Sequence, residues 1–243
     1  MTRRRSNIYG GQDPRELPAY SMAEAARYVE LAPATLRSWV AGREYPKSDG
    51  TVAFFEPIIQ RPDPSRTQLS FWNLVEAHVL RALRIKHNVS IKAVRFALDF
   101  SQDKYRIQRL LLSPELRTEA GDLFLDKYGE LINLSKSGQL AMKTLLQNYL
   151  EMIDRGTKNL PIRLYPFSRR FPVPQGVPPD RASRLIVIDP YVSFGRPVIK
   201  RQGISTAIIS DRIDAGESVL DLAKDYDLEP WEINGALIYE KAA

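Results

Sequence analysis

The sequence YSMAEAARYVELAPATLRSWV occupies residues 20–40 and has the spacing of two short helices joined by a tight turn. Ser21 and Glu24 stand three residues apart, as the two members of a capping box do, and they predict the start of the first helix. Pro33 is tolerated at the first position of the second helix, because the amide hydrogen that proline lacks has no helical partner there. We therefore expect a helix-turn-helix in this part of the chain.

The second of these helices has an apolar side and a polar side. Leu36, Trp39 and Val40 recur at the spacing of a buried face. The outward positions carry small, hydroxyl and guanidinium groups, at Ala34, Thr35, Arg37 and Ser38. Arginine can donate two hydrogen bonds to guanine, and threonine can contact a thymine methyl group or a phosphate. This pattern predicts a helix that reads the major groove, with candidate DNA contacts at Thr35, Arg37, Ser38 and the nearby Arg43.

A β-hairpin wing is expected after the two helices. Val52–Ile59 and Thr67–Ser70 are extended runs, and residues 60–66 between them, QRPDPSR, form a tip punctuated by prolines. Arg61 and Arg66 on this tip are candidate contacts to the DNA backbone or minor groove. A solvated hairpin without a DNA role is the alternative.

Composition and charge limit the class of protein. The chain has 243 residues, of which 44% are hydrophobic, so it can form two or three modest domains. It has no cysteine, which suits a reducing cytosol, and no apolar run near the roughly 18 residues of a membrane span. We therefore expect a cytoplasmic protein without a membrane partner.

The net charge of +6 is unevenly distributed. Residues 1–112 hold 18 basic and 11 acidic side chains, whereas residues 113–243 hold 17 and 18. Within the second half, residues 155–201 hold 10 basic and 2 acidic side chains, and residues 211–243 hold 3 and 9. The positive excess accompanies the helix-turn-helix, which favours nucleic acid as its partner, and the other two zones indicate a partner of another kind.

Residues 18–98 resemble the MerR-like winged-helix family. The resemblance rests on the capped first helix, on Leu36-Arg37-Ser38-Trp39 in the second, on the wing, and on Leu69-Ser70-Phe71, where a longer helix begins. It implies a winged helix-turn-helix that binds operator DNA. A palindromic operator requires a homodimer, because one recognition helix covers only a half-site.

The middle of the chain, residues 99–166, is expected to be an α+β region that contributes to dimerisation. Asp122–Ser135 is interpreted as two short strands about Gly129. Gly138–Arg155 has a helical pattern, and Leu160–Pro166 has the pattern of a strand.

Two segments have the composition of linkers. Residues 1–17 are polar and rich in Arg, Gly and Pro, and we expect a flexible arm there, with binding along DNA phosphates as the alternative. Residues 167–184, FSRRFPVPQGVPPDRASR, contain four prolines and four arginines without periodicity. They predict a spacer or, alternatively, a basic strap on an acidic partner.

Residues 185–243 have the pattern of a small three-helix domain. Leu185–Ile188 predicts a strand, and the helices are expected at Thr206–Ala215, Val219–Tyr226 and Trp231–Lys241. Their surface is acidic, which disfavours phosphate binding and favours a protein partner. In the block Phe194-Gly195-Arg196-Pro197, Phe194 is expected in the core; the alternative interpretation has Arg196 reaching a partner carboxylate.

This segment closely resembles the C-terminal domain of unknown function, family number 433, found in VapB-like antitoxins. The matching residues are Asp189-Pro190, the block Val192-Ser193-Phe194-Gly195-Arg196-Pro197, the block from Ile208 to Ala215-Gly216-Glu217-Ser218, and Leu222-Ala223 through Tyr226. The resemblance implies an antitoxin that neutralises a PIN-like ribonuclease toxin. Because guanidinium groups compete with Mg²⁺ for clustered carboxylates, the candidate toxin contacts are Arg163, Arg169, Arg170 and Arg196.

No motif for catalysis, a metal or a cofactor is evident. His78 and His87 lie nine residues apart, not at the spacing of two ligands on one helical face, and no phosphate-binding glycine loop occurs. The sequence therefore predicts a non-enzyme, mainly α with small β-hairpins (α+β), with a winged helix-turn-helix and a C-terminal three-helix domain. The alternative functions are a stand-alone MerR-like transcription regulator with a C-terminal oligomerisation module, and an interaction module without a DNA role.

Overall fold

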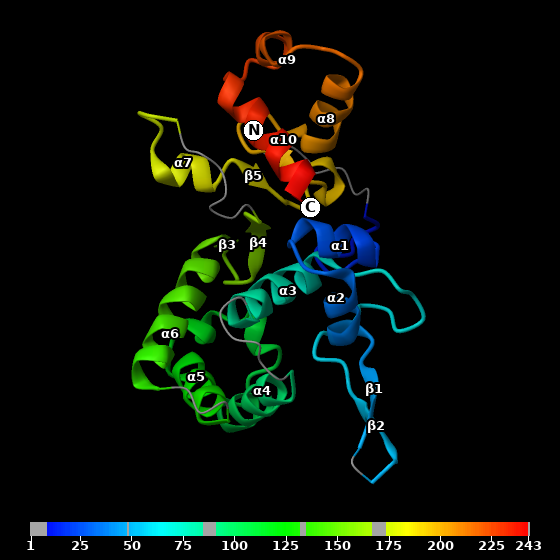
Figure 1. Ribbon diagram of the computed structural model, residues 1–243, viewed down its shortest axis with the longest axis vertical. Coiled ribbons are helices and arrows are strands. Elements are labelled where there is room, and N and C mark those ends of the chain that lie inside the picture. Colours follow the sequence, from blue (N-terminus) through cyan, green and yellow to red (C-terminus); the bar gives the residue numbers. More distant parts are fainter. Residues whose placement is uncertain (1–8, 48, 85–90, 132–134, 167–173, 243) are drawn as a thin grey trace.

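The computed structural model describes residues 9–47, 49–84, 91–131, 135–166 and 174–242. Figure 1 shows a lower lobe built from α3, α4, α5 and α6, an upper lobe with α7 to α10, and the pair α1 and α2 beside the junction. A two-stranded hairpin, β1 with β2, projects away from both lobes (Figure 1). The expected fold class, mainly α with small antiparallel strand pairs, is confirmed.

The helices and strands follow one another along the described chain as segments of 2 to 16 residues. In the first half they are α1 Met22–Tyr28, α2 Pro33–Val40, β1 Arg43–Pro46, β2 Val52–Phe55, α3 Phe71–Arg84, α4 Ile91–Tyr105 and α5 Glu119–Leu131. In the second half they are α6 Lys136–Glu151, β3 Ile153–Arg155, β4 Pro161–Leu164, α7 Pro179–Ser183, β5 Ile186–Val187, β6 Val198–Ile199, β7 Ile204–Ser205, α8 Thr206–Asp214, α9 Val219–Asp225 and α10 Pro230–Ala242.

The helix-turn-helix forms as the capping residues predict. The Ser21 hydroxyl accepts a hydrogen bond from the Glu24 amide, and the Glu24 carboxylate accepts one from the Ser21 amide, at 3.2 and 2.9 Å. Leu36, Trp39 and Val40 are buried on the inner side of α2. The predicted burial of these three residues is confirmed.

The hairpin lies earlier in the chain than the sequence patterns suggested. β1 pairs with β2 in antiparallel register from Arg43↔Phe55 to Pro46↔Val52. The prediction that residues 60–66 are the tip was wrong, because the turn of the hairpin lies between Pro46 and Val52, which are paired. Within it, the Lys47 amide donates to the Thr51 carbonyl, and Gly50 has a φ of +81°. Asp-Gly is a strong turn signal, and here it marks the wing.

The helix α3 is buried on all sides. Every residue from Phe71 to Leu83 is buried, and the helix forms the centre of the main core together with α1, α2 and residues from α4, α5 and α6. Its polar side chains therefore need internal partners. The Glu76 carboxylate accepts hydrogen bonds from Arg109 at 2.8 and 2.9 Å, and Arg81 forms an ion pair with Glu30 at 2.5 Å.

Residues 122–131 are helical, so the predicted hairpin of Asp122–Ser135 was wrong. They lie within α5, whose residues Phe124, Leu125 and Tyr128 are buried at helical spacing. The hairpin was predicted from Gly129, because glycine is more often found in a turn than inside a helix. In this helix Gly129 faces α6, and a Cβ there would lie 2.8 Å from the side-chain nitrogen of Gln139.

The C-terminal part has its own small core. Strands β5, β6 and β7 form an antiparallel sheet, and Ile199, Ile209, Leu222 and Ile233 are buried in the same cluster. Ser218 caps α9 by accepting a hydrogen bond from the Asp221 amide, as the sequence predicts. The three predicted helices correspond to α8, α9 and α10.

The two lobes are joined by backbone and side-chain contacts. Leu164 at the end of β4 exchanges backbone hydrogen bonds with Ile188, at 3.0 and 2.8 Å. Near the N-terminus, the Tyr9 hydroxyl donates to the Pro190 carbonyl at 2.8 Å, and Arg15 lies over the ring of Trp72. These contacts tie the described residues of the expected arm, 9–17, to the body. No helix in the described ranges is long and apolar enough to span a membrane.

Candidate functional site

The outer face of α2 presents the candidate base-reading residues. Arg37 is exposed, and within the described residues no ion pair or hydrogen bond engages its guanidinium group. Thr35 and Ser38 are half-buried beside it, and the Ser38 hydroxyl donates to the Thr35 carbonyl at 2.8 Å. One cation and two hydroxyl groups thus lie together on one helical face.

The projecting hairpin adds an aromatic and basic surface next to α2. Tyr45 and Phe55 stack with ring centroids 4.0 Å apart, and the Arg43 guanidinium lies 5.8 Å from the centroid of Phe55. Gly42 sets the angle between α2 and the hairpin, because it has a φ of +72° and a Cβ would lie 2.2 Å from the Phe55 carbonyl oxygen. The side chain of Arg43 therefore lies against an aromatic ring of the hairpin.

Arg61 and Arg66 lie together on the loop between β2 and α3. Arg61 donates to the Arg66 carbonyl at 2.6 Å, and Arg66 forms an exposed ion pair with Asp63 at 3.3 Å. Asp63 also accepts hydrogen bonds from the amide and hydroxyl of Ser65, which shape the turn. The two arginines are thus placed near each other by a local turn rather than by the hairpin that the sequence suggested.

The C-terminal domain docks on α1, on the helix that precedes the recognition helix. Arg27 of α1 forms an ion pair with Glu240 of α10, and the Tyr239 hydroxyl donates to the Tyr28 carbonyl at 3.3 Å. Figure 1 shows the end of α10 beside α1. The C-terminal domain therefore contacts α1, which residues 29–32 connect to the helix that carries Arg37.

Arg196 anchors this docking through the capping box. Its guanidinium contacts the Glu24 carboxylate and the Tyr28 hydroxyl. Burial acts to raise the pKa of the Glu24 carboxyl, but hydrogen bonds from Ser21 and the charge of Arg196 outweigh it and lower the pKa. Glu24 thus both caps α1 and binds the C-terminal domain.

The loop before Arg196 is unusual in its backbone. Ser193, Phe194 and Gly195 all have positive φ, and the Phe194 side chain is 72% exposed. The expectation that Phe194 fills the core was therefore wrong: the left-handed backbone turns its ring outward. Gly195 packs directly on Tyr20, where an added Cβ would lie 2.1 Å from the tyrosine oxygen.

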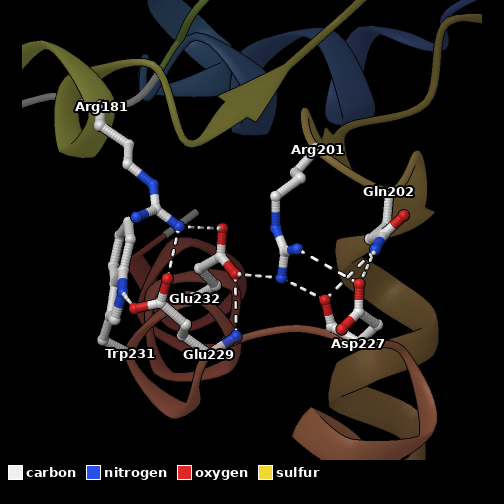
Figure 2. Close-up of polar contacts among 7 residues, drawn as sticks. All are labelled: Arg181, Arg201, Gln202, Asp227, Glu229, Trp231 and Glu232. Carbon is white, nitrogen blue, oxygen red and sulfur yellow. Dashed lines mark hydrogen bonds and ion pairs between the residues drawn. The ribbon is translucent and has the colours of Figure 1, made fainter.

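A pocket of about 640 Å³ opens between α7, the turn after β6 and α10. Four cations line it together with three acidic side chains; the cations are Arg181, Arg184, Lys200 and Arg201. Figure 2 shows Arg181 and Arg201 reaching Glu232 from opposite sides, at 3.4 and 3.1 Å. Because the Glu232 side chain is only 2% exposed, these pairs fix both arginines at the rim.

Neighbouring contacts hold the rim of the pocket. Arg181 also forms an ion pair with Glu229 at 2.7 Å and lies over the ring of Trp231. The hydrogen bond from Arg181 lowers the pKa of the Glu229 carboxyl. Arg201 and Gln202 both contact Asp227 (Figure 2).

Lys200 and Arg184, which also line the pocket, both lie over the ring of Tyr165. The Lys200 amine lies 5.1 Å and the Arg184 guanidinium 4.9 Å from the centroid of that ring. Arg184 also forms an ion pair with Asp154 at 3.2 Å. Lys200 is exposed and, among the described residues, has no carboxylate partner. It is the cation at this pocket that an acidic ligand would meet without displacing an internal ion pair.

Two of the four arginines predicted for a toxin contact, Arg163 and Arg196, lie among the described residues. Arg163 forms an ion pair with the buried carboxylate of Asp189 at 2.8 Å, and that hydrogen bond raises the pKa of Arg163. Arg196 contacts Glu24, whereas Arg169 and Arg170 lie outside the described residues. Arg163 and Arg196 therefore each bind a different carboxylate of their own chain.

The sequence did indicate the pocket, but only coarsely. The basic excess of residues 155–201 includes all four of its cations. Glu232, the buried carboxylate that organises two of them, comes from the acidic tail, and only the fold brings it beneath the arginines. The helices of this tail were expected to present an acidic surface, whereas the Glu232 side chain is buried.

Within the described ranges, no group of three or more His, Asp or Glu side chains could hold a metal ion. His78 is buried in the main core, where its Nε2 faces the Tyr149 carbonyl oxygen at 3.2 Å. His87 lies outside the described residues.

Comparison with known proteins matches both ends of the chain. Residues 18–98 match the family described as "Putative DNA-binding HTH domain", and residues 186–239 match "Protein of unknown function (DUF433)". The chain is 28% identical over 240 residues to "Putative antitoxin VapB45" of Mycobacterium tuberculosis, covering 91% of this chain and 93% of that protein. The resemblances expected from the sequence are thereby confirmed.

Two further proteins of Mycobacterium tuberculosis are similar over most of their length. The uncharacterized protein Rv2308 is 28% identical over 232 residues, covering 91% of this chain and 90% of the relative. The crystal structure of Rv2018 matches with a TM-score of 0.62 at 24% identity, over 91% of this chain and 98% of that one. The last comparison shows a shared fold.

Proposed function

We propose that this protein is a DNA-binding antitoxin, which represses its own operon through the helix-turn-helix and neutralises a PIN-like ribonuclease toxin through its C-terminal half. The observation that carries the proposal is the similarity, over 91% of the chain, to a protein named as an antitoxin. The match of residues 18–98 to a DNA-binding family supports the first half of the activity.

Operator binding is assigned to the exposed face of α2 and to the hairpin. Arg37 offers a guanidinium that can donate two hydrogen bonds to a guanine, and Thr35 and Ser38 place hydroxyl oxygens beside it. Arg43 on the hairpin, with Arg61 and Arg66 on the following loop, supplies positive charge for the DNA backbone. The two kinds of contact have different roles: base contacts specify the operator, and phosphate contacts position the protein.

Toxin binding is assigned to the basic pocket rather than to Arg163 and Arg196 in isolation. Those two arginines already bind carboxylates of their own chain. Lys200, by contrast, has no carboxylate partner among the described residues, and together with Arg184 it lines a pocket large enough for acidic side chains. A PIN-like ribonuclease holds metal with clustered carboxylates, and charge-assisted contacts to such carboxylates compete with the metal. Arg169 and Arg170 precede the pocket in sequence and remain candidates for the same contact.

Capture of the toxin tests this assignment. The full-length protein, tagged, is expressed together with the small protein encoded beside its gene, and the amount of captured partner and its ribonuclease activity are measured. Lys200→Glu should reduce the affinity by about tenfold or more, because a charge that faces the partner's carboxylates is reversed. It breaks no ion pair among the described residues, so the fold should survive.

The matched control is Lys136→Glu, which reverses an exposed charge at the start of α6, away from the pocket. It should leave capture unchanged. Equal capture by wild type, Lys200→Glu and Lys136→Glu would remove the pocket from the toxin interface. If no ribonuclease is captured by any of them, the stand-alone transcription regulator becomes the better explanation.

A further inference from the structure

Residues 191–194, which we call the aromatic loop, present large apolar side chains to solvent between β5 and β6. The Phe194 side chain is 72% exposed, more than any other large apolar side chain among the described residues. Tyr191 is 43% exposed and Val192 36% exposed. Apolar surface is unfavourable in water, so three such side chains close together on one loop indicate a surface that a partner covers.

The backbone of the aromatic loop turns the Phe194 ring outward in an unfavourable conformation. Ser193 has a φ of +47° and Phe194 a φ of +53°. This left-handed region is disfavoured for residues that carry a Cβ atom. Strain of this kind persists only where surrounding contacts determine the conformation, and it clusters at functional sites. Exposure of the ring is therefore a feature that the rest of the fold imposes.

Contacts on both sides hold the aromatic loop in place. Before it, the buried carboxylate of Asp189 accepts hydrogen bonds from the Tyr191 amide at 2.9 Å and from Arg163 at 2.8 Å. After it, the Gly195 carbonyl accepts a hydrogen bond from the Tyr20 hydroxyl at 3.2 Å. Because both ends are held, a partner meets a loop that needs little further ordering, which favours tight binding.

The aromatic loop also lies against the turn that carries two cations of the basic pocket. A Cβ atom on Gly203, in the turn of residues 200–203, would lie 3.8 Å from the Val192 side chain. Lys200 and Arg201 of the same turn line the pocket. The apolar loop and the basic pocket are therefore neighbouring parts of one surface, and a partner whose carboxylates enter the pocket also reaches the loop.

The two parts of this surface supply different kinds of binding. Charges at the rim of an interface mainly increase the association rate and select the partner, whereas buried aromatic anchors carry most of the affinity. Arg181, Arg184 and Arg201 of the pocket already bind carboxylates of their own chain. The pocket therefore steers an acidic partner but needs an apolar anchor beside it to hold that partner.

We propose that the aromatic loop, with Phe194 at its centre, is the apolar anchor by which this chain holds the ribonuclease toxin next to the basic pocket. The inference rests on the proposed function for the identity of the partner. It assigns to that partner an apolar cleft bordered by carboxylates, because the loop is apolar and the adjoining pocket is cationic. The loop then sets how slowly the complex dissociates, and Lys200 sets how fast it forms.

Binding kinetics of the full-length protein test the assignment. The small protein encoded beside its gene is purified and passed over immobilised wild type, Phe194→Asn and Phe194→Tyr, and both rates are measured by surface plasmon resonance. Asparagine removes the ring but adopts the left-handed conformation more readily than most residues. Phe194→Asn should dissociate at least tenfold faster and associate at nearly the wild-type rate. Phe194→Tyr keeps the ring and should match wild type.

Two controls separate this role from a structural one. Because the Phe194 ring is mostly in solvent and asparagine suits the backbone, Phe194→Asn should melt at or above the temperature of wild type. Leu220→Ala is the matched control, because it removes an apolar side chain that is 70% exposed on α9. It should leave both rates unchanged.

The assignment of the loop is overturned if Phe194→Asn dissociates like wild type, if it melts at a lower temperature, or if Leu220→Ala accelerates dissociation equally. In each of these cases wild type still binds the ribonuclease, so the proposed function stands. Wild type that does not bind this protein would contradict the proposed function itself, and the assignment of the loop would fall with it.

Discussion

Gly195 lies against Tyr20 so closely that no side chain fits between the C-terminal domain and the helix-turn-helix. Its φ is +76°, and the Tyr20 hydroxyl donates to its carbonyl oxygen at 3.2 Å inside the protein. The neighbouring Arg196 binds Glu24, which is itself half of the capping box of α1. Gly195 and Arg196 therefore bind the C-terminal domain to the DNA-binding domain. The sequence could not show this role, because Tyr20 and Glu24 lie more than 170 residues away from them.

Gly195→Ala should lower the free energy of unfolding for two reasons: a left-handed backbone and a steric conflict with Tyr20. Each source of strain typically costs 1–3 kcal/mol, so we expect a loss of roughly 2–5 kcal/mol in urea denaturation. Gly216→Ala is the matched control, because Gly216 also has a positive φ, +98°, but nothing lies within 4 Å of its added Cβ. Equal losses for the two variants would show that the Tyr20 contact contributes nothing.

Helix α3 carries polar residues although it is buried on every side, and His78 is the one that titrates near neutral pH when unfolded. This histidine lies at the centre of the helix, 2% exposed. Because Nε2 faces a carbonyl oxygen, the neutral ring carries its proton there, and the buried Nδ1 has no partner among the described residues. Burial, with the nearby charge of Arg81, lowers the pKa of His78 to about 3. The ring therefore stays neutral in the folded protein at ordinary pH.

Acid should destabilise the fold through His78. The unfolded imidazole has a pKa near 6.5, so below that pH the unfolded state binds a proton that the folded state does not. The contribution of neutral His78 is thus fully present above about pH 6.5, and it is lost by about 1.4 kcal/mol for each pH unit as the pH falls toward the folded pKa.

Urea denaturation at a series of pH values, with His78→Gln as the comparison, measures this contribution. Glutamine keeps a hydrogen-bond donor for the Tyr149 carbonyl but does not titrate. As the pH falls from 7 to 4, the unfolding free energy of wild type should decrease relative to that of His78→Gln. Parallel curves for the two proteins would contradict this expectation, since all other titrating groups are common to both.

Elements could be predicted from the sequence where local signals agree with the fold. The caps Ser21 and Ser218 begin α1 and α9 as expected, and the apolar spacing within α2 matches its burial. Two predictions failed for physical reasons. Gly129 fits against α6 inside a helix, and the wing turn rests on Asp49-Gly50 rather than on the proline loop. The first prediction failed because tertiary packing keeps Gly129 inside a helix. The second failed because the turn signal Asp49-Gly50 was overlooked.

At the scale of the molecule, the candidate DNA surface and the candidate partner pocket lie on different elements: the first on α2 and the β1–β2 hairpin, the second between α7, the turn after β6 and α10. Arg27 and Tyr28 of α1 bind α10, while the recognition face of α2 remains exposed. The charge division along the chain anticipated two kinds of surface. It could not show that the C-terminal domain is braced on α1, because that arrangement depends on contacts between residues some 170 to 210 positions apart.

The contact between the C-terminal domain and α1 links the two proposed activities. A toxin bound at the basic pocket would contact the same domain that holds α1 through Glu240 and Arg196. Binding of toxin and of operator DNA should then influence each other, and thermodynamic linkage requires that any such influence be reciprocal.

The affinity of the full-length protein for a duplex from its own promoter, measured by fluorescence anisotropy over a range of salt concentrations, tests the central claim most directly. Several phosphate contacts should make the logarithm of the binding constant fall steeply with the logarithm of salt concentration. Arg37→Ala should lose roughly 1–3 kcal/mol on the promoter duplex and little on a random duplex, whereas Lys136→Ala should match wild type. We predict salt-dependent binding that prefers the promoter sequence; wild-type protein that shows no such preference, or no salt-dependent binding at all, would contradict a DNA-binding role.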